Sequence, residues 1–308
     1  MQWESKKINL IAGLSEDRTL FTNGVRSMFL STLAFSLANI CVKQVSHIPP
    51  VEVLFFRCTI ATTLCVIGIQ HKKADWWGSN RKLLFFRGLF GTTALYLFFV
   101  TLQNIPLAPA TTLQYLSPIF TSIIAIFLLK ESVRPFQWIC YAIAFGGVLL
   151  IERFDARVSL LYALFGIGSA FCSGVAYNLV RSLRGKEDPL TVVLHFQGTG
   201  AIVGFIGIFF EWQTPQGWDW LFLLMIGVFS QLGQIFLTNA FQREPVAGVA
   251  IVIYTGLVYA LLVGALVFGE EQSAVSMSGM LLVVFGVLLS VLHGRRMRDL
   301  DKIEATAG

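Results

Sequence analysis

Polar side chains interrupt several of the long apolar stretches of this 308-residue chain. In one stretch Gln231, Gln234 and Thr238 share a helical face, because residues three and four apart lie above one another. An unpaired polar group in hydrocarbon is costly, so a polar face turns toward a cavity or toward another helix. We favour a cavity for these glutamines over packing between helices.

The first apolar stretch carries a comparable face, formed by Thr32, Ser36, Asn39 and Lys43. Hydrogen bonds to a neighbouring helix and hydrogen bonds to a solute both explain this face. The assignment of Asn39 as a binding residue is strengthened because the equivalent position in the second half of the chain, Asn178, is also an asparagine.

A third polar stretch contains Gln114, Tyr115 and Pro118. Proline has no backbone N–H, so Pro118 leaves the carbonyl of Gln114 without its usual i+4 donor. The freed carbonyl needs another partner inside a membrane, and we therefore expect a kink beside a cavity. Tyr115 and Tyr254 occupy equivalent positions, and they either face each other across that cavity or pack as an ordinary pair of tyrosines.

Two arginines, Arg57 and Arg87, lie inside apolar stretches. We expect Arg87 to extend its guanidinium to the nearby membrane surface, as long cationic side chains do. Arg57 lies deeper, roughly 9 Å from the end of its helix. Binding of a carboxylate or phosphate, a structural polar cluster and extension to the surface all remain open for Arg57.

Together these residues predict one substrate-binding site near the middle of the membrane. Amides and tyrosine hydroxyls would supply neutral hydrogen bonds, and Arg57 would favour an anionic group. The predicted site consists of Asn39, Arg57, Tyr96, Gln114, Tyr115, Asn178, Gln231, Gln234 and Tyr254.

No residue pattern for catalysis, metal binding or nucleotide hydrolysis accompanies this site. The sequence has no GxxxxGKS/T, HExxH or CxxC motif, and its five cysteines all lie in apolar stretches. We therefore predict no enzymatic activity, no metal and no cofactor. The carboxylates lie near helix ends, which argues against proton coupling through an intramembrane acid. A channel or an interaction subunit remains an alternative to a carrier.

The elements that must hold these residues are membrane-spanning helices. Hydrophobic residues make up 55% of the chain and charged residues only 13%, about half the charge of a soluble domain. This composition argues against a soluble enzyme, a nucleic-acid-binding protein and a disordered protein, and runs without a period of two argue against a β-barrel. Since a span needs about 20 apolar residues, we predict an all-α polytopic membrane protein. Its ten transmembrane helices are expected at 24–45, 51–70, 83–103, 108–129, 135–152, 158–181, 189–211, 218–241, 246–268 and 273–293.

Charge orients these spans. With the N-terminus in the cytoplasm, 18 lysines and arginines fall on the cytoplasmic side and three on the outer side. Cytoplasmic loops carry an excess of these residues, so we predict both termini in the cytoplasm and a location in the cell (inner) membrane. Residues 1–22 are polar and lack the apolar core of a signal peptide, so we expect the first span to be retained.

The chain also resembles itself at a constant offset of 139 residues. The matching pairs include Asn39–Asn178, Pro50–Pro189, Gln103–Gln242, Pro106–Pro245, Tyr115–Tyr254, Glu131–Glu270 and Gly147–Gly286. Five spans per repeat is an odd number, so the second repeat enters the membrane from the opposite side, as in alternating-access transporters. We predict two inverted five-helix repeats at 24–152 and 158–293. A cytoplasmic segment, 1–23, precedes them and a cytoplasmic tail, 294–308, follows them.

Short segments of the chain resemble the EamA-type branch of the drug/metabolite transporter superfamily. They are PVEVLFFR at 50–57, LQYLSP at 113–118, LKE at 129–131 and the glycine pair at 146–147. The resemblance covers about residues 24–293, and it implies the ten-helix fold and transport of a small metabolite. The first two segments look most like carriers of S-adenosylmethionine and of organic anions.

The resemblance thus implies a carrier for a small polar or amphipathic metabolite, working by alternating access through a central cavity. Candidate solutes are an organic anion, an amino-acid derivative or an S-adenosylmethionine-like compound. The expected partners are this solute and the lipid bilayer, without nucleic acid. A monomer and a homodimer both remain open.

Overall fold

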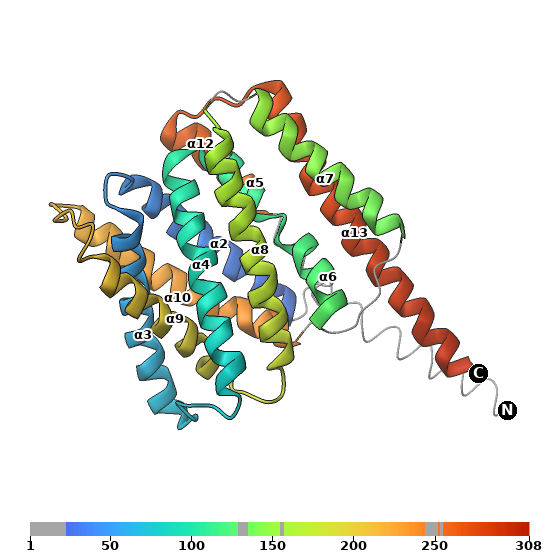
Figure 1. The fold of residues 1–308 in the computed structure, drawn as a ribbon, viewed down its shortest axis with the longest axis horizontal. Helices are drawn as coiled ribbons and strands as arrows, with labels where there is room; N and C mark the ends of the chain where they lie inside the picture. Colours follow the sequence, from blue (N-terminus) through green and yellow to red (C-terminus); the bar gives the residue numbers. More distant parts are fainter. Residues whose placement is uncertain (1–22, 129–134, 155–156, 244–251, 253–254, 308) are drawn as a thin grey trace.

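The computed structural model describes residues 23–128, 135–154, 157–243, 252 and 255–307. Over these residues the chain is helical and contains no strand (Figure 1). The described helices are α2 (Asn23–Gln44), α3 (Pro50–Lys72), α4 (Arg81–Asn104), α5 (Leu107–Gln114), α6 (Ser117–Leu128), α7 (Pro135–Phe154), α8 (Leu160–Ser182), α9 (Pro189–Gly207), α10 (Asp219–Arg243), α12 (Thr255–Phe268) and α13 (Ala274–Ala307).

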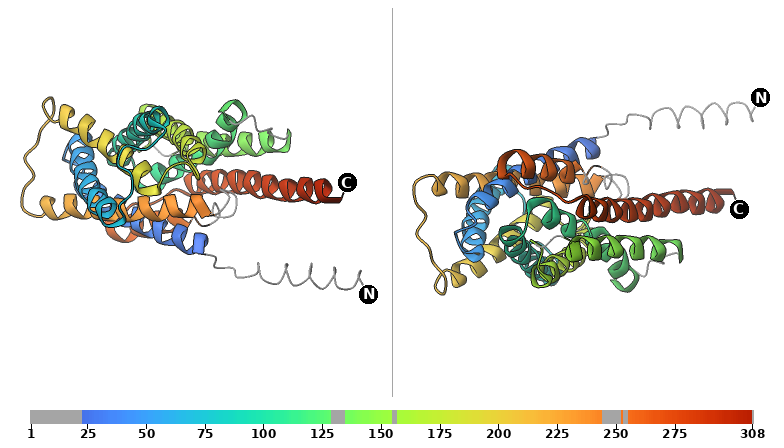
Figure 2. Two further views of the ribbon diagram at one scale, coloured as in Figure 1. Left: turned by 90° about the horizontal axis from the view of Figure 1, so that it is seen from below. Right: turned by 90° about the horizontal axis from the view of Figure 1, so that it is seen from above.

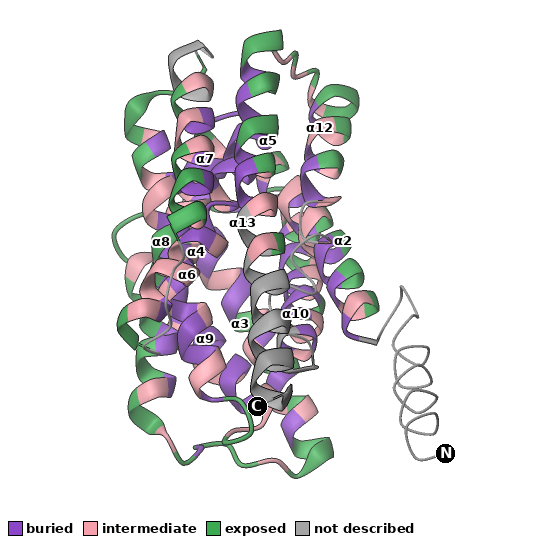
Figure 3. Ribbon diagram, turned by 90° about the vertical axis from the view of Figure 1, so that its right-hand side faces the viewer, coloured by how far each residue is buried: buried purple, intermediate pink, exposed green. Residues whose placement is uncertain are grey.

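The length and composition of these helices suit a bilayer. Seven segments are long and apolar enough to cross it, with α5 and α6 counted together as one segment, and the apolar parts of α7, α12 and α13 are shorter. Large apolar side chains such as Phe127, Phe210 and Leu266 are 78–84% exposed. Figure 3 shows buried residues facing the inside of the bundle and exposed residues covering its outer surface. The prediction of an all-helical polytopic membrane protein is confirmed.

Most described helices begin and end within two residues of the predicted spans. α9 is an exception: it ends at Gly207 instead of 211, because the chain tightens into a turn in which the Phe210 N–H donates to the Gly207 carbonyl at 2.9 Å. α13 continues through the predicted tail to Ala307. Its 34 residues span about 51 Å, well beyond the roughly 30 Å of a hydrocarbon core. Of the predicted span 246–268, all but Val252 and α12 lies outside the described residues.

The kink predicted at Pro118 is confirmed as a break between α5 and α6. The Tyr115 N–H donates to the carbonyls of Thr111 and Thr112, and the Leu116 N–H donates to Leu113 at 3.1 Å. α6 then starts at Ser117. Proline at the second position of a helix costs no hydrogen bond, because the first turn has no intrahelical acceptor for its N–H groups.

Helices from the two halves of the chain pack against one another in pairs. α2 lies along α10, α4 along α8, α3 along α9 and α7 along α13. Figure 1 shows the α7–α13 pair at one side of the bundle, and Figure 2 shows the end of α13 projecting beyond it. α4 also contacts α9, and α3 contacts α10. The two halves therefore interleave rather than forming separate bodies.

Glycines permit the close contact between α7 and α13. A Cβ atom added at Gly147 would lie 2.5 Å from the carbonyl oxygen of Gly279 and 2.8 Å from the nitrogen of Val283. A Cβ atom at Gly286, the equivalent residue of α13, would lie 2.6 Å from the carbonyl oxygen of Cys140. Small residues let membrane helices approach backbone to backbone, and here they do so on both partners.

Two sets of polar contacts mark the two ends of the bundle. At one end, the Glu270 end, Lys43 pairs with Glu270 and His47 hydrogen-bonds to Asp219 at 3.0 Å. At the opposite end, the Glu187 end, the carboxylate of Glu187 accepts hydrogen bonds from the backbone N–H groups of residues 79 and 80. The connections therefore alternate between two ends, as the sequence predicts for successive spans.

Candidate functional site

A cavity of about 210 Å³ lies in the middle of the bundle. Residues from α2, α3, α4, α5, α6, α8, α9, α10 and α12 line it, so both halves of the chain contribute to its wall. Its volume lies just below the roughly 300 Å³ at which pockets for drug-sized ligands begin. The cavity therefore suits a small metabolite.

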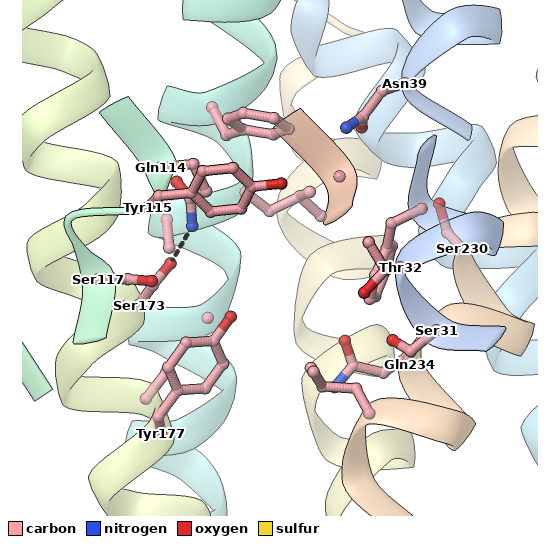
Figure 4. A pocket seen from close by; sticks show the side chains of 18 of the residues that line it. Ser31, Thr32, Asn39, Gln114, Tyr115, Ser117, Ser173, Tyr177, Ser230 and Gln234 are labelled. Atoms are coloured by element: carbon pink, nitrogen blue, oxygen red, sulfur yellow. Dashed lines mark hydrogen bonds between the residues drawn. The ribbon is translucent and has the colours of Figure 1, made fainter. Parts of the chain in front are cut away.

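Apolar side chains form most of the surface of this cavity, and neutral polar groups lie among them (Figure 4). Figure 4 shows two facing walls, one formed by α5, α6 and α8 and the other by α2 and α10. The polar residues that it labels are Ser31, Thr32, Asn39, Gln114, Tyr115, Ser117, Ser173, Tyr177, Ser230 and Gln234. Amides and hydroxyls both donate and accept hydrogen bonds, so this mixed lining suits a small amphipathic solute.

Hydrogen bonds fix the orientation of one of these amides. Ser169 Oγ donates to Gln114 Oε1, and Gln114 Nε2 donates to Ser173 Oγ, both at 2.8 Å. Ser169 also donates to the carbonyl of Ala94 in α4. The side chain of Gln114, at the last turn of α5, is therefore held against α8 next to the helix break.

Arg57 lies on the cavity wall with only 3% of its surface exposed. Its Nη1 donates to Gln197 Oε1 at 3.5 Å. Gln197 Nε2 in turn donates to Gln231 Oε1 at 3.3 Å, and Gln231 Nε2 contacts Cys65 Sγ at 3.1 Å. Gln231 therefore belongs to a buried chain of hydrogen bonds behind Arg57. The expectation that it lines the cavity is wrong.

Arg87 also lies on the cavity wall and is 3% exposed. The expectation that its guanidinium reaches the membrane surface is therefore wrong. The Cζ atom of Arg87 lies 4.3 Å from the ring centre of Phe196, and that of Arg57 lies 5.7 Å from the same ring. The side chain turns inward because α9 offers an aromatic face there, which attracts a cation.

The structure brings five of the nine predicted site residues to the cavity. These are Asn39, Arg57, Gln114, Tyr115 and Gln234. Tyr96 is not among the lining residues and is 37% exposed. Asn178 is fully buried behind the wall, where Nδ2 donates to the carbonyl of Thr121 in α6 at 2.8 Å. Tyr254 lies outside the described residues.

Arg87, Tyr177 and Phe196 are among the cavity residues that the sequence did not predict. A signal for Tyr177 existed, because Ser169, Ser173 and Tyr177 recur every four residues and form a polar stripe on α8. Phe196 is the residue equivalent to Arg57 at the offset of 139. An aromatic residue in an apolar stretch carries no signal of its own, so only the fold reveals its contact with two arginines.

Contacts between the two halves of the chain hold the helices together at the Glu270 end. The carboxylate of Glu270 accepts a hydrogen bond from the Leu107 N–H at 2.9 Å, which caps the start of α5. Glu270 also pairs with Lys43 Nζ at 3.5 Å, and Lys43 donates to the Ile105 carbonyl at 2.6 Å. A carboxylate at a helix N-terminus is favourable. Glu270 thus ties α2, α5 and the loop before α13 together.

Comparison with known proteins agrees with this architecture. The profile of the EamA-like transporter family matches residues 22–153 and again residues 160–292. A solved crystal structure superposes with a TM-score of 0.67 at 18% identity, covering 89% of this chain and 98% of that one. That likeness concerns the fold alone.

Similar proteins include bacterial and human transporters. The pseudopaline exporter CntI of Pseudomonas aeruginosa is 30% identical over 86% of this chain and 94% of its own length. Human solute carrier family 35 member G1 is 30% identical over 85% of this chain and 76% of its own length. An S-adenosylmethionine uptake transporter of Rickettsia felis is 23% identical over 90% of this chain and 95% of its own length. With both halves matched by the family profile, the chain belongs to the EamA-like transporter family of the drug/metabolite transporter superfamily.

Proposed function

We propose that this membrane transporter is a carrier that moves a small polar or amphipathic metabolite by alternating access. The observation that carries the proposal is the central cavity, enclosed by helices from both halves and lined by amides, hydroxyls and two arginines. The named relatives include an exporter and an uptake transporter. Their names therefore support transport without supporting one direction of transport.

The proposed architecture is ten spans in two inverted five-helix repeats, with α5 and α6 forming one span and 246–268 forming another. The two matches of the family profile support the division into 24–152 and 158–293. The packing of the helices supports it as well, because α2–α10 corresponds to α8–α4, and α3–α10 corresponds to α9–α4. The α3–α9 and α7–α13 pairs each join a helix to its own counterpart.

The directions of equivalent helices support the inversion. α2 ends at the Glu270 end, where Lys43 pairs with Glu270. Its counterpart α8 begins at that end, where the Tyr162 carbonyl lies within 3.4 Å of Thr101 Oγ1. Two similar halves of opposite direction are able to exchange conformations, which opens the same cavity to either side in turn.

We place the Glu187 end and both termini in the cytoplasm of a cell (inner) membrane. Lysines and arginines of the described connections gather near the Glu187 end, at Lys72, Lys73, Arg81, Lys82, Arg181, Arg184 and Lys186. The Glu270 end carries fewer, and such an excess is typical of cytoplasmic loops.

Counterflow in proteoliposomes tests the carrier function. Purified protein is first screened by thermal unfolding against amino acids, nucleosides, S-adenosylmethionine and di- and tricarboxylates, because a specific ligand stabilises the folded state. Each stabilising compound is then loaded inside vesicles, and uptake of its radiolabelled form is measured. A carrier shows faster uptake in loaded vesicles than in empty ones.

The same experiment separates the alternatives. A channel equilibrates the label without acceleration by internal compound, and an enzyme alters the compound. Vesicles without protein provide the baseline. Absence of accelerated exchange for every compound in the panel would contradict the proposal.

A further inference from the structure

Two buried guanidinium groups lie in the cavity wall without an acidic partner. Arg57 and Arg87 are each 3% exposed, and no Asp or Glu occurs among the described residues that line the cavity. The hydrogen-bond acceptors of Arg57 are the neutral side chains of Gln197 and Cys58. For Arg87, Nε and Nη1 are buried and have no hydrogen-bond partner among the described residues.

This arrangement leaves positive charge without compensation. Arginine stays protonated in proteins, and a buried charge is strongly unfavourable unless it is paired and hydrogen-bonded. The ring of Phe196, which both arginines contact, stabilises a cation only in part. The described acidic residues lie at helix ends instead, where Glu187 and Glu270 cap backbone N–H groups. Because no described residue balances this charge, the content of the cavity is the source of negative charge that the described site calls for.

Building on the proposed carrier function, we propose that the transported solute is a small dianion whose oxyanion groups bind Arg57 and Arg87. Planar guanidinium groups match carboxylate and phosphate groups through paired hydrogen bonds. Arg57 comes from α3, Arg87 comes from α4, and both guanidinium groups contact the Phe196 ring. The neutral amides and hydroxyls of the remaining wall bind the uncharged part of the solute.

Charge balance distinguishes this class of solute from the alternatives. Two cations are neutralised by two negative charges, so a dianion is favoured over a monoanion or a neutral metabolite. S-adenosylmethionine carries a sulfonium and an ammonium group against one carboxylate, and its net positive charge would be repelled by both arginines. The site is also asymmetric, because the positions equivalent to Arg57 and Arg87 are Phe196 and Ile226.

A charge series with one carbon skeleton tests the proposal. Succinate, succinamate and succinamide carry two, one and no negative charges at neutral pH. Each is titrated against the purified protein, and the thermal unfolding midpoint gives the half-saturating concentration. Dicarboxylates from malonate to adipate vary the spacing of the charges, and glycerol 3-phosphate, whose phosphate alone carries about two negative charges, tests phosphate as their source. We expect the best dianion to bind about tenfold or more tightly than its monoamide, the size typical of hydrogen bonds to a charged group.

Variants test the two arginines. We expect R57Q and R87Q each to abolish the preference for two charges over one. R87K retains the charge while losing the planar fork, and we expect it to keep part of the preference. This variant also covers the case in which R87Q does not fold. R81Q serves as the matched control, because Arg81 lies on the same helix, is exposed and does not line the cavity.

Three results would overturn the proposal: equal binding of the charged and uncharged compounds, an unchanged preference in R87Q, or equal stabilisation by chloride alone. Failure of this inference is distinguishable from failure of the carrier function. Counterflow of a neutral or cationic compound, without a preference for dianions, leaves the carrier function intact and removes the dianion site. Preferential dianion binding without counterflow leaves the site and removes the carrier function.

Discussion

Arg57 and Phe196 occupy equivalent positions at the offset of 139, and in the folded chain they contact each other. The next pair, Cys58 and Gln197, also meets around the same guanidinium group. The scaffold is thus similar in both halves while the chemistry of the site is not.

Asn39 and Asn178 show how equivalent residues take different roles. Asn39 lines the cavity, whereas Asn178 is buried and bonds to Thr121 and Gly174. We expect Asn178→Ala to lower the free energy of unfolding by roughly 1–3 kcal/mol with unchanged solute affinity. Asn39→Ala should weaken solute binding while leaving the unfolding midpoint nearly unchanged.

Thermal unfolding with and without the transported compound measures both effects for the Asn39 and Asn178 variants. The reverse pattern, with lost affinity in Asn178→Ala and lost stability in Asn39→Ala, would show that the roles are assigned to the wrong residues. Wild-type protein in the same detergent is the reference.

At the scale of elements, the close packing of α7 against α13 requires glycine at position 147 but not at the neighbouring position 146. A side chain at Gly147 would meet the backbone of α13, whereas a Cβ at Gly146 meets nothing within 4 Å. We expect Gly147→Ala to destabilise the protein by about 1–3 kcal/mol, as overpacking does. Gly146→Ala is the matched control and should be neutral or slightly stabilising, because alanine favours a helix over glycine by about 1 kcal/mol.

This prediction is tested by comparing the thermal unfolding midpoints of the Gly146 and Gly147 variants in the same detergent. Equal midpoints for the two variants would mean that α7 and α13 do not pack backbone to backbone through Gly147. A stabilised Gly147→Ala would mean the same.

The contacts of Glu270 predict that this residue holds the Glu270 end of the bundle closed. Glu270→Gln removes the negative charge that holds Lys43 and weakens the cap on α5. A partly buried pair contributes about 1 kcal/mol, so its loss should raise the population open at the Glu270 end by roughly fivefold. Under the proposed alternating access, we expect Glu131, the equivalent residue at the offset of 139, to close the opposite end.

A cysteine at Ser36, which lines the cavity, reports this opening. We expect a membrane-impermeant maleimide added at the Glu270 end to label it faster in Glu270→Gln than in the parent protein. Glu271→Gln is the control, since Glu271 is exposed. Equal labelling rates in both variants would contradict a closing role for Glu270.

For the whole molecule, orientation in the membrane follows from the distribution of charge. Ser46 is exposed at the Glu270 end and Ser79 is exposed at the Glu187 end. We expect an impermeant maleimide to label Ser46→Cys from outside intact cells and Ser79→Cys only after permeabilisation. The native cysteines are buried or partly buried, and the parent protein measures their background. The opposite labelling pattern would reverse the orientation.

The sequence alone determined that the chain forms apolar helices and where most of the described helices begin and end. Apolar runs and prolines predicted most helix ends to within two residues of their positions in the structure. Pro118 predicted the break between α5 and α6. The polar faces of α2 and α10 also contributed Asn39 and Gln234 to the cavity as expected. These features follow from hydropathy and helical spacing, which are properties of residues close together in the chain.

The tertiary structure decided which polar residues meet. Gln231 and Gln234 are three residues apart, yet only Gln234 reaches the cavity, because Gln197 of α9 covers Gln231. Tyr96 faces outward, and Arg87 turns inward onto Phe196. The rotation of each helix about its axis and the neighbours it packs against set these outcomes, and both depend on residues far apart in the sequence. The sequence therefore predicts that polar groups gather at a site, whereas the packing of the helices decides which side chains form that site.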